Sequence, residues 1–129
     1  ALIDALLGAS ALGNIGHHFP DTDPRWDGAN SMGLLAATVR LIEDRNYQVV
    51  NADVTIVTET PRIGPWVEEM AERIAELLRV ARSCISIKGK TNEGMGWIGR
   101  GEGLATMAVV LLDQIGDIDT LHASIRTGG

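Results

Sequence analysis

Apolar residues recur every three or four positions in three segments of the chain, which is the spacing of an amphipathic helix. The first segment covers residues 1–12 and is followed by Gly13, a residue type that often ends helices. The second begins at Ser31, which suits an N-cap, and runs to about residue 45, and the third follows Pro65. The residues expected to face the core are Leu35, Val39 and Ile42 in the second helix and Trp66, Met70, Ile74, Leu77 and Leu78 in the third.

β-Branched residues in alternating patterns predict strands over residues 47–59 and 84–90. The apolar run 104–112 fits a strand or a helix by pattern, but its length and paired valines favour a buried strand. The long connection 14–30 has two prolines and two aspartates within residues 19–24. This composition predicts a loop without regular structure.

The predicted order is helix, helix, strand, helix, strand, strand, which indicates an α+β fold, an α/β sandwich with helices covering one face of the sheet. Residues 1–129 are assigned to one domain, and the polar tail 116–129, which ends in glycines, is expected to be loose. The strands carry more apolar residues than one small core can hold, so a homo-oligomer that packs sheets together is expected. These apolar residues are Val49, Val57, Ile85, Ile87, Val109 and Leu111.

Composition narrows the function classes. Of 129 residues, 45% are hydrophobic, which is too many for a disordered chain, and the 4% aromatic share implies an aliphatic core. A net charge of −6 argues against a broad surface for nucleic acids or anionic membranes, and no apolar run reaches membrane-spanning length. The single cysteine, Cys84, excludes an internal disulfide and is expected to be a small buried hydrophobe. The chain opens at Ala1 in a helix-like run without an N-cap, which predicts that residues precede it.

The most distinctive stretch, residues 86–103, contains six glycines together with lysine, threonine, arginine and glutamate. Glycine lets a backbone approach a ligand closely, and these cations and hydroxyls hold phosphate oxygens, so the stretch predicts an anion-binding loop. Glu93 suits a divalent ion beside a diphosphate, and the alternative is a solvated loop residue. Gly94–Gly99 matches G-x-G-x-x-G, but too little chain follows Leu112 for the further parallel strand of a dinucleotide site.

Other polar residues have simpler interpretations. His17 and His18 are expected to be a solvated loop pair, because adjacent side chains diverge and one ion would not take both. His122 is expected to lie on the surface of the tail. Asp21 and Asp23 are turn formers by type, and ribose hydroxyls or ligand amines are their alternative partners.

Several short blocks occur together along the chain. They are Asp4–Ala9, Gly13–Gly16, Phe19–Pro24, Asn51–Ile56, Pro61–Arg62, Lys88–Glu93 and Gly99–Gly103. In content, order and spacing they resemble the 2-C-methyl-D-erythritol 2,4-cyclodiphosphate synthase family of the non-mevalonate isoprenoid pathway. The resemblance extends from Ala1 to about Leu112, and its most specific blocks are Phe-Pro-Asp-Thr-Asp-Pro and Gly-Arg-Gly-Glu-Gly.

The resemblance implies a lyase with a mixed sheet, assembled as a homotrimer with active sites between subunits. Its substrate would be 4-diphosphocytidyl-2-C-methyl-D-erythritol 2-phosphate, whose 2-phosphate attacks the β-phosphorus and releases CMP, forming 2-C-methyl-D-erythritol 2,4-cyclodiphosphate. Thr91 matches the residue that stabilises the transition state, and Glu93 matches a ligand of Mg²⁺ or Mn²⁺. The ligands of a catalytic Zn²⁺ are expected upstream of Ala1 and are absent from this sequence.

The resemblance also implies a set of binding residues. Segment 58–64 would surround cytosine through backbone groups, with 90–93 beside it, while 14–16 and 19–23 would reach ribose and methylerythritol from the neighbouring subunit. Trp97 and Arg100 would lie near the trimer axis, where an isoprenoid diphosphate binds. The full set is Asn14, Ile15, Gly16, Phe19, Pro20, Asp21, Thr22, Asp23, Thr58, Glu59, Thr60, Pro61, Arg62, Ile63, Gly64, Lys90, Thr91, Asn92, Glu93, Trp97 and Arg100.

Two positions depart from the family pattern: Asn14 stands where many members have aspartate, and Lys90 replaces a common threonine and adds positive charge beside the diphosphate. The alternative function is a non-catalytic trimer that binds a cytidine nucleotide or an isoprenoid diphosphate. The missing zinc ligands favour that alternative, and the intact Thr91 and Glu93 oppose it. The expected location is the bacterial cytoplasm, or a plastid in a plant or alga, without nucleic-acid or membrane partners.

Overall fold

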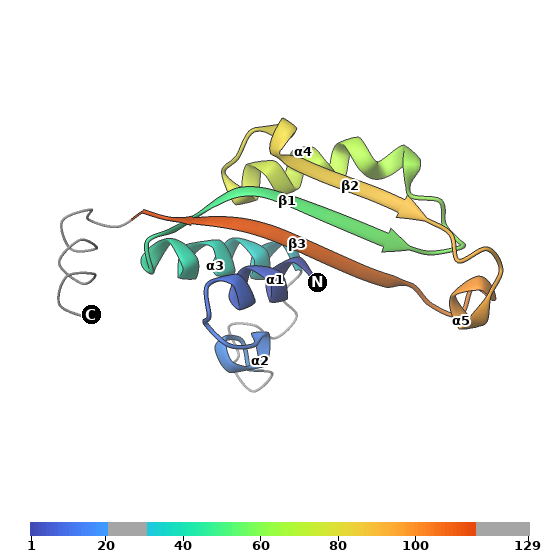
Figure 1. Cartoon of the computed structure of the whole chain (residues 1–129), viewed down its shortest axis with the longest axis horizontal. Helices are drawn as coiled ribbons and strands as arrows, with labels where there is room; N and C mark the ends of the chain where they lie inside the picture. Colours follow the sequence, from blue (N-terminus) through green and yellow to red (C-terminus); the bar gives the residue numbers. More distant parts are fainter. Residues whose placement is uncertain (21–30, 116–129) are drawn as a thin grey trace, which may run out of the picture.

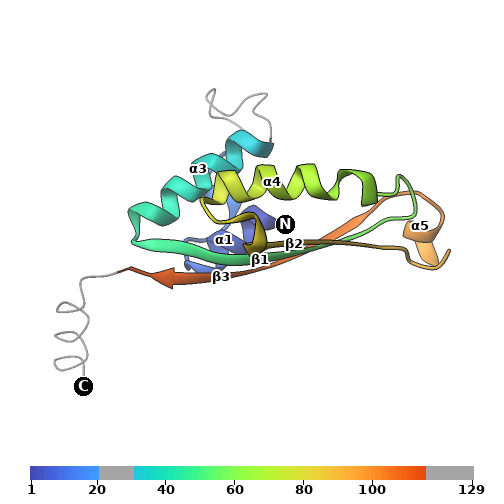
Figure 2. The ribbon, with the colours of Figure 1, turned by 90° about the horizontal axis from the view of Figure 1, so that it is seen from above.

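The computed structural model describes residues 1–20 and 31–115 of the chain. These residues form one mixed β-sheet with helices packed on one side, and the longer elements follow the predicted order (Figures 1 and 2). The elements are helices α1 (Leu2–Ala9), α2 (Ile15–His18) and α3 (Ser31–Asp44), strand β1 (Tyr47–Val57), the 3₁₀ turn η2 (Gly64–Trp66), helix α4 (Val67–Leu78), the 3₁₀ turn η3 (Arg82–Cys84), strand β2 (Ile85–Lys90), helix α5 (Gly96–Gly99) and strand β3 (Ala105–Gln114).

The sheet has the strand order β2-β1-β3, with β1 in the centre. β1 runs parallel to β2, with Ala52 opposite Ile85. It runs antiparallel to β3, and a register shift between Val49 and Asn51 marks a bulge. Because β1 and β2 are parallel, their carboxyl ends lie at the same end of the sheet, beside the short helix α5 (Figure 1).

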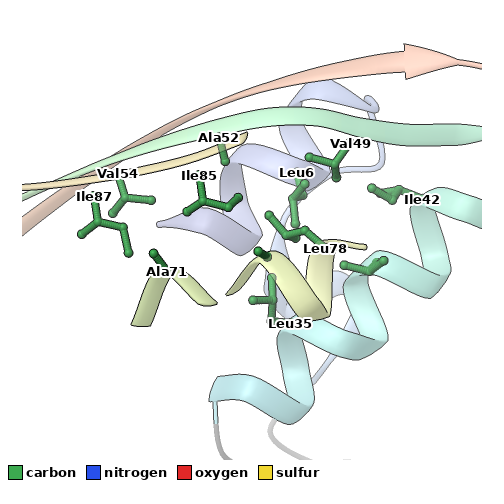
Figure 3. Packing of buried hydrophobic residues seen from close by; sticks show 12 residues of the cluster. Leu6, Leu35, Ile42, Val49, Ala52, Val54, Ala71, Leu78, Ile85 and Ile87 are labelled. Carbon is green, nitrogen blue, oxygen red and sulfur yellow. The ribbon is translucent and has the colours of Figure 1, made fainter. Parts of the chain in front are cut away.

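The core lies between the sheet and helices α1, α3 and α4 (Figure 3). Alternate strand residues point towards the helices, which contribute aliphatic residues at helical spacing, so the predicted face of α3 is confirmed. Each large aliphatic side chain fully removed from water stabilises the fold by about 1.5–3 kcal/mol. The buried members are Leu6, Leu35, Val39, Ile42, Val49, Ala52, Val54, Ala71, Ala75, Leu78, Ile85 and Ile87.

Helix α1 is shorter than predicted and ends at Ala9. The Ser10 hydroxyl donates to the Leu6 carbonyl at 2.8 Å, and this bond occupies a carbonyl at the helix end. Ala11 and Gly13 then take positive φ angles, which a right-handed helix does not contain. The prediction that the helix ends before Gly13 is therefore correct, but the helix ends at Ala9 and not at residue 12.

The predicted apolar stripe of α4 is partly wrong. Trp66 lies in η2, before the helix, and is 56% exposed. The buried line of α4 consists of Ala71, Ala75 and Leu78. The alanines allow the helix backbone to lie close to the sheet, so the larger predicted residues flank the contact and are only partly buried: Met70, Ile74 and Leu77.

The connection predicted to be irregular contains the short helix α2. Its first turn is capped by Asn14, whose side-chain oxygen accepts a hydrogen bond from the His17 amide at 3.0 Å. The prolines and aspartates that follow led to the prediction of a loop, so this short helix was missed. Residues 21–30 of the connection, and the tail 116–129, lie outside the described residues.

The strands form where predicted, with three corrections. β1 ends at Val57, two residues early, and Cys84 lies in η3, where it is partly rather than fully buried. β3 is a strand, but not a buried one, because only alternate residues face the helices. In the described residues, no helix has the length and apolar character needed to cross a bilayer.

The face of the sheet away from the helices is open in the single chain (Figure 2). Met107, Val109 and Leu111 of β3 form an apolar row on this face and are 59%, 71% and 54% exposed. The predicted surplus of apolar strand residues is thus confirmed for Val109 and Leu111. Val49, Ile85 and Ile87, which were counted in the same surplus, instead pack beneath the helices.

Candidate active site at the ends of strands β1 and β2

Two chain segments meet where the parallel strands β1 and β2 end. Segment 58–64 follows β1, and segment 91–95 follows β2. The Thr58 amide donates to the Lys90 carbonyl at 2.9 Å, which extends the pairing one step beyond β1. The parallel pairing therefore brings together two segments that the resemblance assigns to one nucleotide site.

A hollow of about 300 Å³ lies between these segments, a volume at the lower end for small-molecule sites. Ile63 packs over β2 because Gly89 has no side chain: a Cβ there would lie 2.7 Å from Cγ1 of Ile63. Arg62 and Lys90 bring positive charge to the lining, which favours an anionic ligand. The lining residues are Thr58, Arg62, Ile63, Gly64, Val67, Gly89, Lys90 and Thr91.

A tight turn after β2 carries Glu93. The Met95 amide donates to the Asn92 carbonyl at 3.0 Å, and the Asn92 side chain donates to the Met95 carbonyl at 2.8 Å. Glu93 and Gly94 have φ angles of 53° and 74°, the pattern of a type I′ turn. This conformation costs a residue with a side chain about 1–2 kcal/mol. The Glu93 amide also donates to the Thr91 hydroxyl at 3.3 Å, which joins the two predicted catalytic residues.

The Glu59 carboxylate connects the two segments. Its Oε1 accepts hydrogen bonds from the amides of Asn92 (2.6 Å) and Gly94 (3.3 Å), which stand on either side of Glu93. The resemblance predicts a role for the backbone of this residue and none for its side chain. No local pattern could have indicated the contact, because the partners are 33 and 35 residues apart.

The glycine-rich stretch folds tightly around this turn. A Cβ on Gly99 would lie 2.0 Å from the carbonyl carbon of Gly94, so the two backbones meet at a distance that only glycine allows. The chain then enters β3, which is antiparallel to β1. The G-x-G-x-x-G pattern therefore does not open the crossover helix of a β-α-β unit, and the dinucleotide alternative is excluded.

Two further predicted residues lie at the surface, Trp97 within α5 and Arg100 directly after it. Trp97 is 50% exposed, and its ring lies over Gly103, where a Cβ would come within 2.6 Å of the ring. The Arg100 guanidinium pairs with the Glu102 carboxylate, with Nε 3.0 Å from Oε1. An anion that binds Arg100 would have to compete with this carboxylate.

A charged pair lies on the open face of the sheet, beside the apolar row. Lys88 donates from Nζ to Oδ2 of Asp53 at 3.0 Å. This hydrogen bond, and to a smaller extent the Ser86 side chain, hold the pKa of Asp53 below its ordinary value of 3.8. Within the described residues, Oδ1 of Asp53 is buried and has no hydrogen-bond partner.

Comparison with known proteins settles the family. The model of the YgbB family matches residues 1–113. The chain belongs to the YgbB family. Relatives named 2-C-methyl-D-erythritol 2,4-cyclodiphosphate synthase include those of Symbiobacterium thermophilum, 54% identical over 87% of this chain and 71% of the relative, and Moorella thermoacetica, 52% identical over 87% and 69%.

Solved structures of related proteins have the same fold as this chain. The bifunctional IspDF from Campylobacter jejuni has a TM-score of 0.83 at 35% identity, covering 88% of this chain and 31% of that chain. A 2C-methyl-D-erythritol-2,4-cyclodiphosphate synthase in a CDP-bound form has a TM-score of 0.80 at 38% identity, covering 88% and 73%. The resemblance seen in the sequence is confirmed.

The first group of predicted binding residues lies elsewhere in the single chain. Residues 14–20 belong to α2 and its flanks, where Asn14 is the cap and Phe19 is buried, with 8% exposure. Figure 1 places α2 away from the end of the sheet beside α5. One copy of the chain therefore does not unite these residues with the hollow, and the predicted positions 21–23 lie outside the described residues.

The histidine pair occupies a helix, not the predicted loop. The rings of His17 and His18 meet edge to face with centroids 5.0 Å apart, and Nε2 of His18 is hydrogen-bonded to the Leu12 carbonyl. In the described part of the chain, no three metal-binding side chains cluster, so these residues supply no zinc site. The exposed carboxylate of Glu93 beside Thr91 does suit Mg²⁺, which binds one or two carboxylates and completes its coordination with phosphate oxygens and water.

Proposed function

We propose that this chain catalyses an intramolecular phosphoryl transfer in 4-diphosphocytidyl-2-C-methyl-D-erythritol 2-phosphate. The 2-phosphate attacks the β-phosphorus, the bond to the CMP oxygen breaks, and 2-C-methyl-D-erythritol 2,4-cyclodiphosphate forms. The activity is that of a cyclodiphosphate synthase, a lyase that releases CMP, and the 54% identity to such an enzyme over 87% of the chain carries this conclusion. Nucleophile and leaving group both belong to the substrate, so the protein acts by positioning and by charge.

The hollow between segments 58–64 and 91–95 is the proposed cytidine site. Ile63 and Val67 offer apolar contact to a base, and backbone amide and carbonyl groups of segment 58–64 would meet its edge. A CDP-bound relative of the same fold supports this use of the site. The dependence on backbone groups would explain why side chains of several types line the hollow.

The proposed diphosphate site lies at the mouth of the hollow. Arg62 and Lys90 supply positive charge, and the Thr91 hydroxyl is free to donate a hydrogen bond to a phosphoryl oxygen while it accepts one from the Glu93 amide. Glu93 would hold Mg²⁺ or Mn²⁺, which when bound neutralises charge on the α- and β-phosphate oxygens. No step is assigned to Zn²⁺, because the described residues hold no ligand set for it.

The proposed assembly is a homotrimer in the bacterial cytoplasm or in a plastid. The open apolar face of the sheet supports association, and a neighbouring copy would bring residues 14–16 and 19–23 to the ribose and methylerythritol. Trp97 and Arg100 would then lie near the trimer axis as an isoprenoid-diphosphate site, with Arg100 released from Glu102.

The test is an assay of CMP release by the natural protein that contains this sequence, with Mg²⁺ or Mn²⁺ present. Glu93→Ala should lower kcat by about 10²–10³-fold, because it removes a charged ligand and no core contact. Glu69→Ala, on the exposed surface of α4, is the matched control and should keep full turnover.

Three outcomes would contradict parts of this proposal. Absence of CMP from the wild-type reaction at every metal concentration would overturn the function. An undiminished kcat for Glu93→Ala would overturn the role of that carboxylate. Binding of CDP without turnover would instead identify the non-catalytic cytidine-nucleotide trimer.

A further inference from the structure

We propose that Glu59 is a positioning residue that clamps the Glu93 turn to the end of strand β1. The proposal rests on the function proposed above and goes beyond it, because it gives a role to a side chain that faces the protein and not the substrate. Its carboxylate accepts hydrogen bonds from the amides of Asn92 and Gly94, the residues before and after Glu93, and so fixes the position of the turn that carries Glu93.

The geometry of the clamp is specific. One oxygen of Glu59 receives both the Asn92 amide at 2.6 Å and the Gly94 amide at 3.3 Å. Hydrogen bonds to an ionised carboxylate are shorter and about twice as strong as those between neutral groups. The Gly94 amide belongs to the peptide plane after Glu93, so that plane cannot rotate without breaking its bond to Glu59. The Asn92 amide belongs to the plane before Asn92, so its bond holds the entry to the turn.

The turn needs an external anchor. Its other hydrogen bonds are local: Asn92 and Met95 bond to each other, and the Glu93 amide bonds to Thr91. These contacts shape the turn but would let it move as a unit. Glu59 is half-buried and stands two residues after the end of β1, so it ties the turn to the central strand of the sheet.

The strained backbone makes the anchor matter more. Glu93 occupies the first central position of a type I′ turn, which favours asparagine, aspartate or glycine. Without the clamp, the residue could relax to a negative φ and turn its carboxylate away from the hollow. Phosphoryl transfer depends on placement to within about an ångström, so such a change would lower turnover even with every substrate contact intact.

The experiment compares Glu59→Ala, Glu59→Gln and wild type in the natural protein. The first readout is hydrogen exchange of the Asn92 and Gly94 amides, followed by NMR without substrate. The second is kcat, KM and the Mn²⁺ concentration that gives half-maximal rate. Glu43→Ala is the matched control, since that carboxylate pairs with Arg79 on the surface of the helices, 3.4 Å away.

In Glu59→Ala we expect exchange at both amides to accelerate on the order of tenfold. We expect kcat to fall and the Mn²⁺ requirement to rise by about 10–100-fold, as is usual when a partner that orients a metal ligand is removed. KM should change far less than kcat. Glu59→Gln should recover most of these losses, because its amide oxygen still accepts both hydrogen bonds, and Glu43→Ala should match wild type.

The proposal is overturned if Glu59→Ala leaves amide exchange and the Mn²⁺ requirement at wild-type values, or if Glu59→Gln is as impaired as Glu59→Ala. If Glu59→Ala does not fold, Glu59→Asp takes its place; its side chain is one methylene shorter and should loosen the Gly94 amide first. A wild-type protein that releases no CMP refutes the proposed function, and the exchange measurements then still decide whether the clamp exists.

Discussion

The apolar row on the open face of β3 offers a direct test of assembly. Val109 is 71% exposed in the single chain and stands opposite Asp53 in the register of the sheet. If another copy covers this face, burial of each Val109 stabilises the assembly by about 1–2 kcal/mol. This is the part of a valine's burial energy that the single chain, with the side chain still exposed, has not gained. Three copies contribute about 3–6 kcal/mol, which corresponds to a factor of about 10²–10⁴ in the association constant.

Val109→Lys should remove this contribution and add the cost of burying an ammonium group. We expect the variant to sediment as a monomer at a micromolar concentration at which the wild type sediments as a trimer. Its far-UV circular dichroism should be unchanged, because this side chain lies on the face away from the helices. Thr106→Lys is the matched control, since it places the same charge on the helix face of the same strand.

Analytical ultracentrifugation decides between the outcomes. A Val109→Lys protein with the mass of the wild-type assembly would show that the open face is not the interface. A wild-type protein that is monomeric at the same concentration would also contradict the proposal that residues 14–20 of a neighbouring copy reach the hollow.

Two further predictions concern stability. Ile42→Ala, at a fully buried position of α3, should lower the free energy of unfolding in urea by about 2–5 kcal/mol, whereas exposed Leu104→Ala should cost well under half of that; equal losses would contradict the core described. The pKa of Asp53 is lowered in the fold by Lys88, so this pair stabilises the protein above pH 3.8 and its contribution is lost as pH falls through the lowered pKa. Asp53→Asn should therefore flatten the decline of Tm below about pH 4, and an unchanged decline would rule out this role.

The elements with a clear local period were predictable. The apolar face of α3 and the strands β1 and β2 follow from residue spacing, and each appears within two residues of its expected bounds. The exposure of Trp66 was not predictable in the same way, nor was it predictable which of the surplus strand residues would be exposed, as Val109 is, and which buried, as Val49 is. Which apolar residues are buried depends on which face the helices cover, and that is a property of the whole fold.

The candidate site also has parts that residue spacing could not predict. Segments 58–64 and 90–93 meet because β1 and β2 are parallel neighbours, a pairing between distant parts of the chain that periodicity does not encode. The resemblance to a family supplied it. Neither residue spacing nor the family resemblance predicted the contacts of Glu59, because they depend on one side chain that bridges two segments distant in the sequence. Asn14 was assigned to the site but lies apart from it in one chain, so its role stays a prediction.

Under the proposed function, an acidic chain binds a diphosphate, and the charges around the hollow bear on how it would do so. Arg62 and Lys90 are the cations, and Glu59 and Glu93 are the carboxylates, so these four side chains cancel in formal charge. The Glu59 carboxylate is already bonded to two amides, which shields it from an anionic ligand. Glu93 is exposed and would repel a diphosphate unless a divalent cation lay between them. If the proposed site is correct, omission of Mg²⁺ and Mn²⁺ should therefore weaken binding of CDP as well as stop turnover.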